Sequence, residues 1–544
     1  MSRRLALPVA PCLAGVLLVA WLLSDPRTPD LAGQVYRLWL YERSGFGIYD
    51  THWYGGHDLP GYSLLFGPLA GLVGLRTLAV VSVLTSTAFF ERTVAGVFGA
   101  ANAVLAGSCL FGVAAVGDVW SGQVTFVLGV AFAVSGAYTV WRRSLPTAAL
   151  LAAASAAASP VAGVLLGLAG LTYALAFGRW RVLIALAGPA AVVAVSVRAL
   201  FGEGGFEPYP ATSFAATIAV VLLFLAALPR VEDGRLRALR IGGLLYLAVC
   251  VGCLVVKTPM GSNLERYGVL LAGPLLLCAL TVPTGTGMVS TAALAGKRRS
   301  VPAIQALALT AIAVWIVWGP WRETEAVAGS PATAAAYYAP VERYLAGHGE
   351  GLERVEVPLT RSHWEAAFLA ESVPLAGGWE KQLQERYDSV LLGKGLTART
   401  YRRWLDEQAI AYVALPDVRL DGSGAAEGRL IESGLPYLKP VFESEHWRLW
   451  AVRAPTPLLS GPAKLTGLGA EGFALKAKAP ARLLARVHYT PYFEVTAGDA
   501  CVGEAPGGWT YVDAKAPGRI AVAARFSVAR AFGSGGGCHF GARP

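Results

Sequence analysis

The hydrophobic positions of the chain form long uninterrupted runs as far as Pro320 and short alternating runs beyond it. The long runs are roughly 17–22 residues each, which is the length at which an α-helix crosses the hydrocarbon core of a bilayer. After Trp321, His, Glu, Arg and Trp are mixed as in a water-soluble protein. The pattern predicts a polytopic α-helical membrane domain over residues 1–320, followed by an extramembrane region.

Short loops connect the apolar runs. Along the chain, loops that contain Lys or Arg alternate with loops that are uncharged or acidic, and cationic loops are retained in the cytoplasm. This alternation predicts eleven spans, a cytoplasmic amino terminus and an extracytoplasmic carboxyl-terminal region. The first run, residues 5–23, lacks a small-residue cleavage site and is interpreted as an anchor. The predicted cytoplasmic segments are Arg3 with Arg4 and residues 91–92, 141–143, 178–181, 230–240 and 297–299. The predicted outer turns are residues 117–123, 159–161, 201–210 and 257–268.

Two successive runs, residues 147–159 and 161–177, are short and are separated by Ser159 and Pro160. A proline interrupts a helix because it lacks an N–H donor. The pair is either a hairpin that crosses part of the bilayer beside a cavity or two ordinary helices joined by a tight turn. The sequence leaves both interpretations open.

The extramembrane region divides in two at a Pro-rich linker, residues 454–462. Helical and strand periodicities alternate before it, which predicts a small α/β domain over residues 321–460. The predicted helices are residues 337–348 and 397–408, and the predicted strands are residues 352–359, 409–416 and 446–453. Period-two patterns predict a β-sandwich over residues 461–544. Its expected inward positions are Leu483, Ala485, Val487 and Tyr489, then Ile520, Val522, Ala524 and Phe526.

Composition supports the membrane class and excludes others. The 544 residues are 55% hydrophobic and only 15% charged, with a mean hydropathy of +0.50, which is more apolar surface than one soluble core can bury. The net charge of +10 could suggest nucleic acid. Its cations lie in short loops rather than on one folded face, so no nucleic-acid partner is predicted.

The seven cysteines divide by compartment. Cys501 and Cys538 are the two in the outer region and flank the last predicted strands, so they are expected to form a disulfide. The other five lie in apolar runs, where a thiol behaves as a small hydrophobic group. Cys250 and Cys253 have CxxC spacing, but without neighbouring His or Cys they do not predict a metal site.

The first outer loop, residues 24–60, carries more ionisable and aromatic residues than any other loop of the membrane domain. Its apolar positions, among them Leu31 and Val35, recur at helical spacing, which predicts an amphipathic helix over residues 31–43 lying on the membrane surface. Asp30 begins this helix. Its carboxylate either caps the helix or accepts a proton from a substrate hydroxyl.

Several segments resemble the GT-C membrane glycosyltransferases, in particular a bacterial YfhO-like branch. They are DLAGQVYR (30–37), THWYGGHDLPGYSLLFGPL (51–69), SGQVTFVLG (121–129), NLERYGVLLAGPLL (263–276) and the strand pair of residues 488–500. The resemblance implies a GT-C fold and a transferase on the outer face of the cell membrane. Its donor would be a polyprenyl-phosphate sugar, and its acceptor a cell-envelope glycan or lipid.

Such a transfer needs a base for the acceptor hydroxyl and a cation for the departing phosphate. The resemblance implies Asp30 as the base, with Asp50 and Asp58 as rivals and Asp118 as a second acidic residue. The implied substrate-binding residues are Arg266, Lys257, Asn263, His52, His57, Trp53 and Tyr54. Each has a plainer alternative, such as membrane anchoring for the arginine and loop packing for the histidines and aromatic residues. No DxD pair occurs, so a divalent metal is not predicted.

Two other functions remain open. A transporter or flippase for a lipid-linked glycan would need ionisable residues within its spans, and Arg76 and Arg198 lie only near span ends. A non-catalytic subunit for cell-envelope assembly would need no carboxylate in the first outer loop.

The loop charges make topology the first testable prediction. Reporter fusions at Arg142, Arg235 and Arg298 should read as cytoplasmic, and fusions at Gly122, Ser262 and Ala335 as external. A cytoplasmic reading at Ala335 would overturn the predicted architecture.

Overall fold

The computed structural model describes residues 8–202, 204–283, 302–348, 352–393, 395–532 and 538. By contacts the chain forms two compact units. The helical unit comprises Met1–Pro26, Ser63–Ser196 and Phe206–Glu325, and the mixed unit comprises Arg27–Tyr62, Val197–Gly205 and Ala326–Pro544. Arg3, Arg4 and residues 297–299 lie outside the described residues. Residues 27–62, assigned above to the membrane domain, group with the carboxyl-terminal region.

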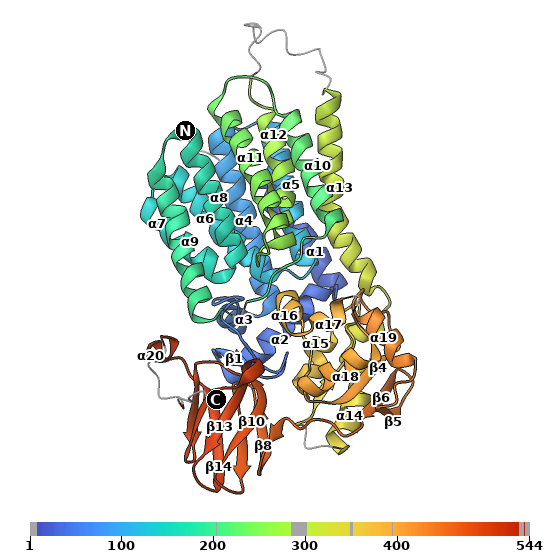
Figure 1. Ribbon diagram of the computed structural model, residues 1–544. Helices are drawn as coiled ribbons and strands as arrows, with labels where there is room; N and C mark the ends of the chain where they lie inside the picture. The colour runs from blue at the N-terminus through green and yellow to red at the C-terminus, as the bar shows by residue number, and fades with distance from the viewer. Residues whose placement is uncertain are drawn as a thin grey trace, which may run out of the picture. The chain divides into compact units, whose positions relative to one another are not determined.

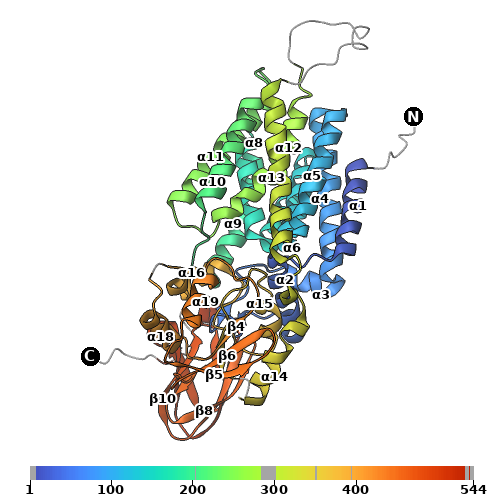
Figure 2. The same cartoon turned by 90° about the vertical axis from the view of Figure 1, so that its right-hand side faces the viewer.

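The helical unit is a bundle of helices that lie side by side (Figures 1 and 2). Its helices are α1 (Val9–Ser24), α3 (Phe66–Val73), α4 (Leu75–Phe98), α5 (Asn102–Trp120), α6 (Val124–Trp141), α7 (Leu145–Ala158), α8 (Pro160–Phe177), α9 (Trp180–Leu200), α10 (Ala211–Ala227), α11 (Gly234–Val255), α12 (Glu265–Ala279) and α13 (Ala303–Val327). Small residues let neighbours approach closely. A Cβ on Gly107 of α5 would lie 2.6 Å from the carbonyl oxygen of Pro274 in α12.

Seven described helices are long and apolar enough to cross a membrane: α4, α5, α6, α8, α9, α11 and α13. In chain order, the eleven predicted spans correspond to α1 and to α4 through α13. Residues 91–92, predicted as a cytoplasmic loop, lie inside α4. The count of eleven is not established, because α7, α10 and α12 are short, with 14, 17 and 15 residues. Helix α1 reaches the required length only together with α2 (Pro29–Ser44), across a bend of 80°.

The break between α7 and α8 is a single-residue turn. Ser159 is the N-cap of α8, and its side chain accepts a hydrogen bond from the N–H of Ala162 at 3.4 Å. Pro160 occupies the first helical position, where its missing N–H costs nothing. Both helices pack against α6. The local geometry therefore supports the tight-turn interpretation.

The mixed unit contains a four-stranded sheet in the order β3 (Arg354–Glu356), β4 (Ile410–Pro416), β6 (Trp447–Val452) and β5 (Leu438–Glu443). Strands β3 and β4 are parallel and the other pairs antiparallel. Its helices are α14 (Ala339–His348), α15 (Glu365–Phe368), α16 (Lys381–Tyr387), α17 (Ser389–Leu392), α18 (Ala398–Glu407) and α19 (Gly424–Glu432), several of which are labelled beside the sheet in Figure 2. The predicted α/β elements are confirmed.

The β-strands after the linker form two antiparallel sheets that share one apolar core. One sheet has the order β12 (Ala500–Glu504), β13 (Trp509–Ala514), β10 (Ala481–His488) and β7 (Leu459–Ser460). The other has the order β11 (Phe493–Ala497), β14 (Gly518–Ala524), β9 (Gly472–Ala477) and β8 (Ala463–Gly469). The predicted inward residues within β10 and β14 are buried. Tyr489 follows the end of β10 and is only partly buried. Phe526 lies beyond the end of β14 and is exposed.

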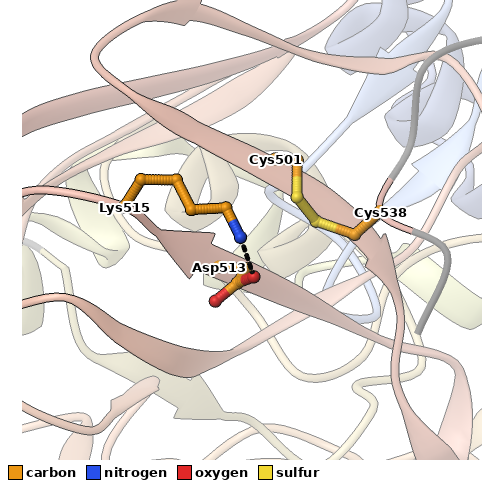
Figure 3. The surroundings of a disulfide bond; sticks show 4 residues. All are labelled: Cys501, Asp513, Lys515 and Cys538. Atoms are coloured by element: carbon orange, nitrogen blue, oxygen red, sulfur yellow. Dashed lines mark hydrogen bonds and ion pairs between the residues drawn. A yellow bond between two sulfur atoms is a disulfide. The ribbon is translucent and has the colours of Figure 1, made fainter. Parts of the chain in front are cut away.

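The predicted disulfide is confirmed. Cys501 of β12 is bonded to Cys538, and their Cα atoms are 5.4 Å apart (Figure 3). The bond attaches the chain beyond the last described helix, α20 (Val528–Ala531), to the edge strand of the first sheet. Asp513 of β13 pairs with Lys515 close to the two cysteines (Figure 3).

Removing this bond should destabilise the sandwich. The two cysteines are 37 residues apart, and closing a loop of that size contributes about 3–4 kcal/mol in the chain-entropy estimate. Cys501→Ser and Cys538→Ser should lower the unfolding midpoint equally, and the double variant by no more than either single one. Additive losses would show that the cysteines act separately. Peptide mapping without reductant should recover the cross-linked pair.

Candidate functional site

Helix α2 carries the first outer loop into the interior of the mixed unit. Pro29 opens the helix after Thr28, and the helix packs against α15. The periodicity predicted the helix correctly. The most buried side includes the polar residues Tyr36 and Arg37, whereas Val35, of the predicted apolar face, is only partly buried. A buried polar side indicates that protein, rather than lipid alone, covers this helix.

The position of α2 depends on Gly33 and Arg37. A Cβ on Gly33 would lie 2.5 Å from the ring of Trp379, so only glycine allows this contact. Arg37 forms an ion pair with Glu380 and lies 3.7 Å from the ring centroid of Tyr62. Because both charged groups are largely buried, loss of either would leave an uncompensated charge inside the unit.

Asp50 is fully buried and accepts hydrogen bonds on both of its carboxylate oxygens. The Tyr36 hydroxyl donates at 2.9 Å, and His52 donates from its main-chain N–H at 3.0 Å. His52 Nδ1 lies 2.8 Å from Oδ1, and His57 Nε2 lies 3.6 Å from Oδ2. Burial opposes ionisation, but the hydrogen bonds and charges of His52 and His57 outweigh it, and the pKa of Asp50 lies below its ordinary value. This environment suits a structural carboxylate better than a base.

The segment after Asp50 turns sharply and is buried. The strands β1 (Tyr49–Asp50) and β2 (His57–Asp58) pair as a hairpin. Gly56 has φ of 117°, and a Cβ there would lie 2.0 Å from the Tyr49 hydroxyl. Trp53 Nε1 donates to the Ala366 carbonyl at 2.9 Å, and the Tyr54 hydroxyl donates to the Glu380 carbonyl at 3.0 Å.

Trp53, Tyr54 and His57 are each 0% exposed. The polar groups of the two aromatic residues already bind main-chain carbonyls, so their rings pack the interior and we do not assign them to sugar stacking. His52 retains some exposure and is the residue of this group that a substrate could reach.

Asp58 and Asp30 are partly buried carboxylates of the loop. Thr490 Oγ1 donates to Asp58 Oδ1 at 3.3 Å. Burial raises the pKa of Asp58 to about 6, against the opposing charges of His57 and Arg386 and the hydrogen bond from Thr490. Asp30 lies in the first turn of α2, where the helix dipole stabilises a carboxylate.

The helical unit holds a second group of predicted residues. Asp118, near the end of α5, is 8% exposed, and its Oδ2 has no hydrogen-bond partner. Arg266, in the first turn of α12, lies close enough to act electrostatically on Asp118 and is 5.1 Å from the ring centroid of Phe126 in α6. The buried side-chain carbonyl of Gln123 also lacks a partner. Burying such polar groups among the apolar helices α5, α6 and α12 costs free energy. Residues of this kind are therefore candidates for a functional site.

The loop that leads to α12 contains Lys257 and Asn263. It binds the preceding loop, because the Glu207 N–H donates to the Thr258 carbonyl at 3.0 Å. Gly261 has φ of 40°, and a Cβ there would lie 2.1 Å from the Glu207 carbonyl oxygen. Lys257 is exposed and lies 4.5 Å from the ring centroid of Phe206.

Behind this loop lies an apolar cavity of about 240 Å³ between α8, α10, α11 and α12. Tyr246 and Tyr267 line it, with ring centroids 5.2 Å apart. The Tyr246 hydroxyl donates to the Leu264 carbonyl at 2.7 Å. Tyr267 follows Arg266 directly, so the wall of the cavity continues into the first turn of α12.

The structure thus gathers the predicted residues into two groups. One, in the mixed unit, contains Asp30, Asp50, His52, Trp53, Tyr54, His57 and Asp58, and the other, in the helical unit, contains Asp118, Lys257, Asn263 and Arg266. Sequence reasoning missed Tyr36, Arg37, Glu380 and Gln123. Nothing in the sequence points to Glu380, because it lies 343 residues from its partner.

Among the described residues, one group of three potential metal ligands lies within 4.8 Å: Cys501, Asp513 and Cys538. Both sulfur atoms belong to the disulfide. That group therefore has no thiolate to offer a metal.

No protein-family model and no curated protein matches the chain. One similar solved structure is the single-particle cryo-EM structure of the arabinofuranosyltransferase AftD from Mycobacteria. It is 18% identical with a TM-score of 0.43, and the match covers 88% of this chain but only 41% of AftD. These comparisons give no support to the YfhO-like branch that the sequence suggested.

Asp50→Asn should destabilise the protein, because it removes a buried charge that two histidines and a tyrosine surround. The expected loss is about 3 kcal/mol at pH 7, measured as a lower unfolding midpoint than that of the exposed control Glu42→Gln. The depressed pKa means that the Asp50 carboxylate contributes stability above about pH 4 and loses it as the pH falls further, so the gap should narrow there. An unchanged midpoint with lost activity would instead make Asp50 catalytic.

Proposed function

We propose that the chain is a GT-C-type membrane glycosyltransferase that moves a sugar from a polyprenyl-phosphate donor to a cell-envelope glycan or lipid on the outer face of the membrane. The observation that carries the proposal is the apolar cavity between α8, α10, α11 and α12, whose wall continues into the turn that holds Arg266. An isoprenoid phosphate needs an apolar cavity and an adjacent cation. The sequence resemblance to that class supports the same assignment.

In this proposal Arg266 binds the donor phosphate, with Lys257 and Asn263 on the same loop as further contacts. Asp118 acts on the Arg266 guanidinium and is a positioning residue that holds this cation. The departing phosphate gains negative charge, which a preorganised guanidinium stabilises more in the transition state than in the ground state.

In this proposal the base that accepts the proton of the acceptor hydroxyl is either Asp30 or Asp58. Asp58 has a pKa raised to about 6 by burial, which is close to the pH at which an envelope enzyme works and therefore favourable for accepting a proton. Asp30 is the position that the sequence resemblance favours. Asp50 is left out, because its oxygens are engaged by Tyr36 and His52.

A transporter of a lipid-linked glycan is the second candidate. The buried Asp118 and the partly buried Arg266 favour it, because ionisable residues within a helical bundle also mark transport pathways. A transporter would move the intact lipid-linked glycan and release no polyprenyl phosphate, so product analysis separates the two functions.

The test uses the full chain in lipid nanodiscs with labelled polyprenyl-phosphate sugars and an envelope-glycan acceptor. If Asp58 is the base, Asp58→Asn should lower kcat by about 10²–10⁴-fold at similar KM. The rate of the unmodified chain should rise with pH through about 6, because the carboxyl must lose its proton, and this rise should vanish in the variant. Asp30→Asn should show these effects instead if Asp30 is the base.

Arg266→Ala should raise KM for the donor as well as lower the rate, because the cation binds phosphate before and during transfer. Glu42→Gln is the matched control for an exposed carboxylate of α2 and should behave as the unmodified chain. Full activity of both Asp30→Asn and Asp58→Asn would contradict the proposed base. Glycan movement without release of polyprenyl phosphate would establish the transporter, and neither activity would favour an assembly subunit.

A further inference from the structure

Three carboxylates surround a small closed cavity in the α/β part of the mixed unit. Glu356 lies on β3, Asp388 lies between α16 and α17, and Glu427 lies on α19. All three are 2% exposed. The cavity that they line has a volume of about 10 Å³, which is room for one water molecule or one ion.

Two of the cavity's carboxylate oxygens lack the partners that buried charges require. Glu356 Oε2 and Asp388 Oδ1 are buried without a hydrogen-bond donor. The third carboxylate, Glu427, accepts a hydrogen bond on Oε1 from the Tyr401 hydroxyl at 2.7 Å. Glu356 and Glu427 face each other closely enough to raise the energy of the doubly charged state. Buried like charges in contact need either a shared proton or a shared cation.

We propose that Glu356, Asp388 and Glu427 form a binding site for a hard divalent cation of the Ca²⁺ class. Such ions take oxygen ligands from carboxylates, amides, hydroxyls and main-chain carbonyls. Gln384 and Ser423 line the same cavity. The Ser423 hydroxyl donates its proton to Asp421 at 2.7 Å, which leaves its lone pairs available. Among the residues that the structure describes, no His or Cys lines the cavity, which disfavours zinc and copper.

The main chain around the cavity is open to a ligand because glycines line it. These glycines are Gly377, Gly378 and Gly424. A Cβ on Gly424 would lie 2.4 Å from the Leu359 carbonyl oxygen, so the chain approaches this region more closely than another residue allows.

Binding would draw the three carboxylates together. Within the described part of the chain they do not bring one oxygen each to within 4.8 Å, the span expected between opposite ligands of Ca²⁺ at about 2.4 Å. Binding would therefore require a side-chain rearrangement that closes that distance. The other ionisable groups that act on the cluster are Glu365, Arg354, Lys381, Asp421 and Tyr401. Arg354 and Lys381 act on Asp388.

Protons compete with the cation for the same oxygens. Burial raises the pKa of Glu427 to about 7, against its hydrogen bonds with Tyr401 and Glu356, and burial also raises the pKa of Glu356 and of Asp388. These groups must lose protons before they bind a cation, so binding should strengthen as the pH rises. Without a cation, the raised pKa of Glu427 reduces the stability of the fold as the pH climbs from about 5 to 7.

The test measures the unfolding midpoint of the full chain in detergent, in chelator and then with Ca²⁺ or Mg²⁺. At pH 8, millimolar Ca²⁺ should raise the midpoint by at least about 2 °C, and the shift should be much smaller at pH 5. Tb³⁺, a luminescent substitute for Ca²⁺, should show tryptophan-sensitised emission, because Trp404 lies beside Asp388. Excess Ca²⁺ should abolish that emission.

The double variant Glu356→Gln with Glu427→Gln removes the charges but keeps the side-chain size. It should fold, unfold in chelator no earlier than the unmodified chain, and lose both the Ca²⁺ shift and the Tb³⁺ emission. Glu365→Gln is the matched control, because Glu365 is buried in the same domain and bonds Thr360 through both oxygens. It should keep the cation response even if its midpoint falls.

Two results would overturn the cation site. A midpoint at pH 8 that neither cation shifts, together with a fall between pH 5 and 8 that the double variant abolishes, would show that the glutamates share a proton instead. Tb³⁺ emission that survives in the double variant would place the bound ion elsewhere.

Discussion

The buried guanidinium of Arg354 is the interaction on which the mixed unit depends most. Arg354 is 1% exposed and donates to the main-chain carbonyls of Gln408 and Arg486. Those carbonyls belong to the α/β sheet region and to the β-sandwich, so one side chain joins two domains. Burial lowers the pKa of Arg354 to about 10, which still leaves it charged at neutral pH. The buried guanidinium is bound by main-chain carbonyls and not by a carboxylate. Because a buried cation that loses a hydrogen bond is costly, the two segments that supply these carbonyls can move little.

The first outer loop packs against the guanidinium of Arg354. A Cβ on Gly55 would lie 3.0 Å from the Arg354 guanidinium, and Gly55 has φ of 74°, so glycine is needed on both grounds. The carbonyl of Gly55 accepts the N–H of His488 at 2.8 Å, and the Tyr49 hydroxyl donates to the His488 carbonyl. The glycines of the THWYGGHD segment therefore serve close packing of the chain, and substrate contact is not needed to explain them.

Local periodicity was enough to predict most secondary structure. The alternation around Leu483 and Ile520 placed β10 and β14 with the correct faces inward, because burial in a sandwich follows a period of two. The compartment argument identified the pair Cys501 and Cys538. Hydropathy located each apolar run, but helix lengths depend on where caps and prolines end the helix, so the span count did not follow from it.

The candidate site was harder to predict because it depends on contacts distant in sequence. The helical period of α2 was visible in the sequence, but the side of the helix that is buried was not. That side is determined by contacts with Trp379 and Glu380, which lie more than 300 residues further along the chain. Asp118 was found as a loop acid, whereas the structure places it near the end of a helix beside Arg266. The sequence showed which residues have side chains that could react. It did not show which of these side chains already form hydrogen bonds or ion pairs inside the fold.

The contrast between Asp50 and Asp58 shows what packing decides. They lie eight residues apart in one hairpin, and sequence reasoning treated them as equal rivals. Around Asp50, a tyrosine and two histidines supply enough donors to hold the carboxylate ionised, with its pKa below the ordinary value. Around Asp58, the charges of His57 and Arg386 and the hydrogen bond from Thr490 do not offset burial, and the pKa rises to about 6. When their environments separate the pKa values of two carboxylates, the two groups can serve different purposes. Asp50 stabilises the folded structure, whereas Asp58 can exchange a proton near neutral pH.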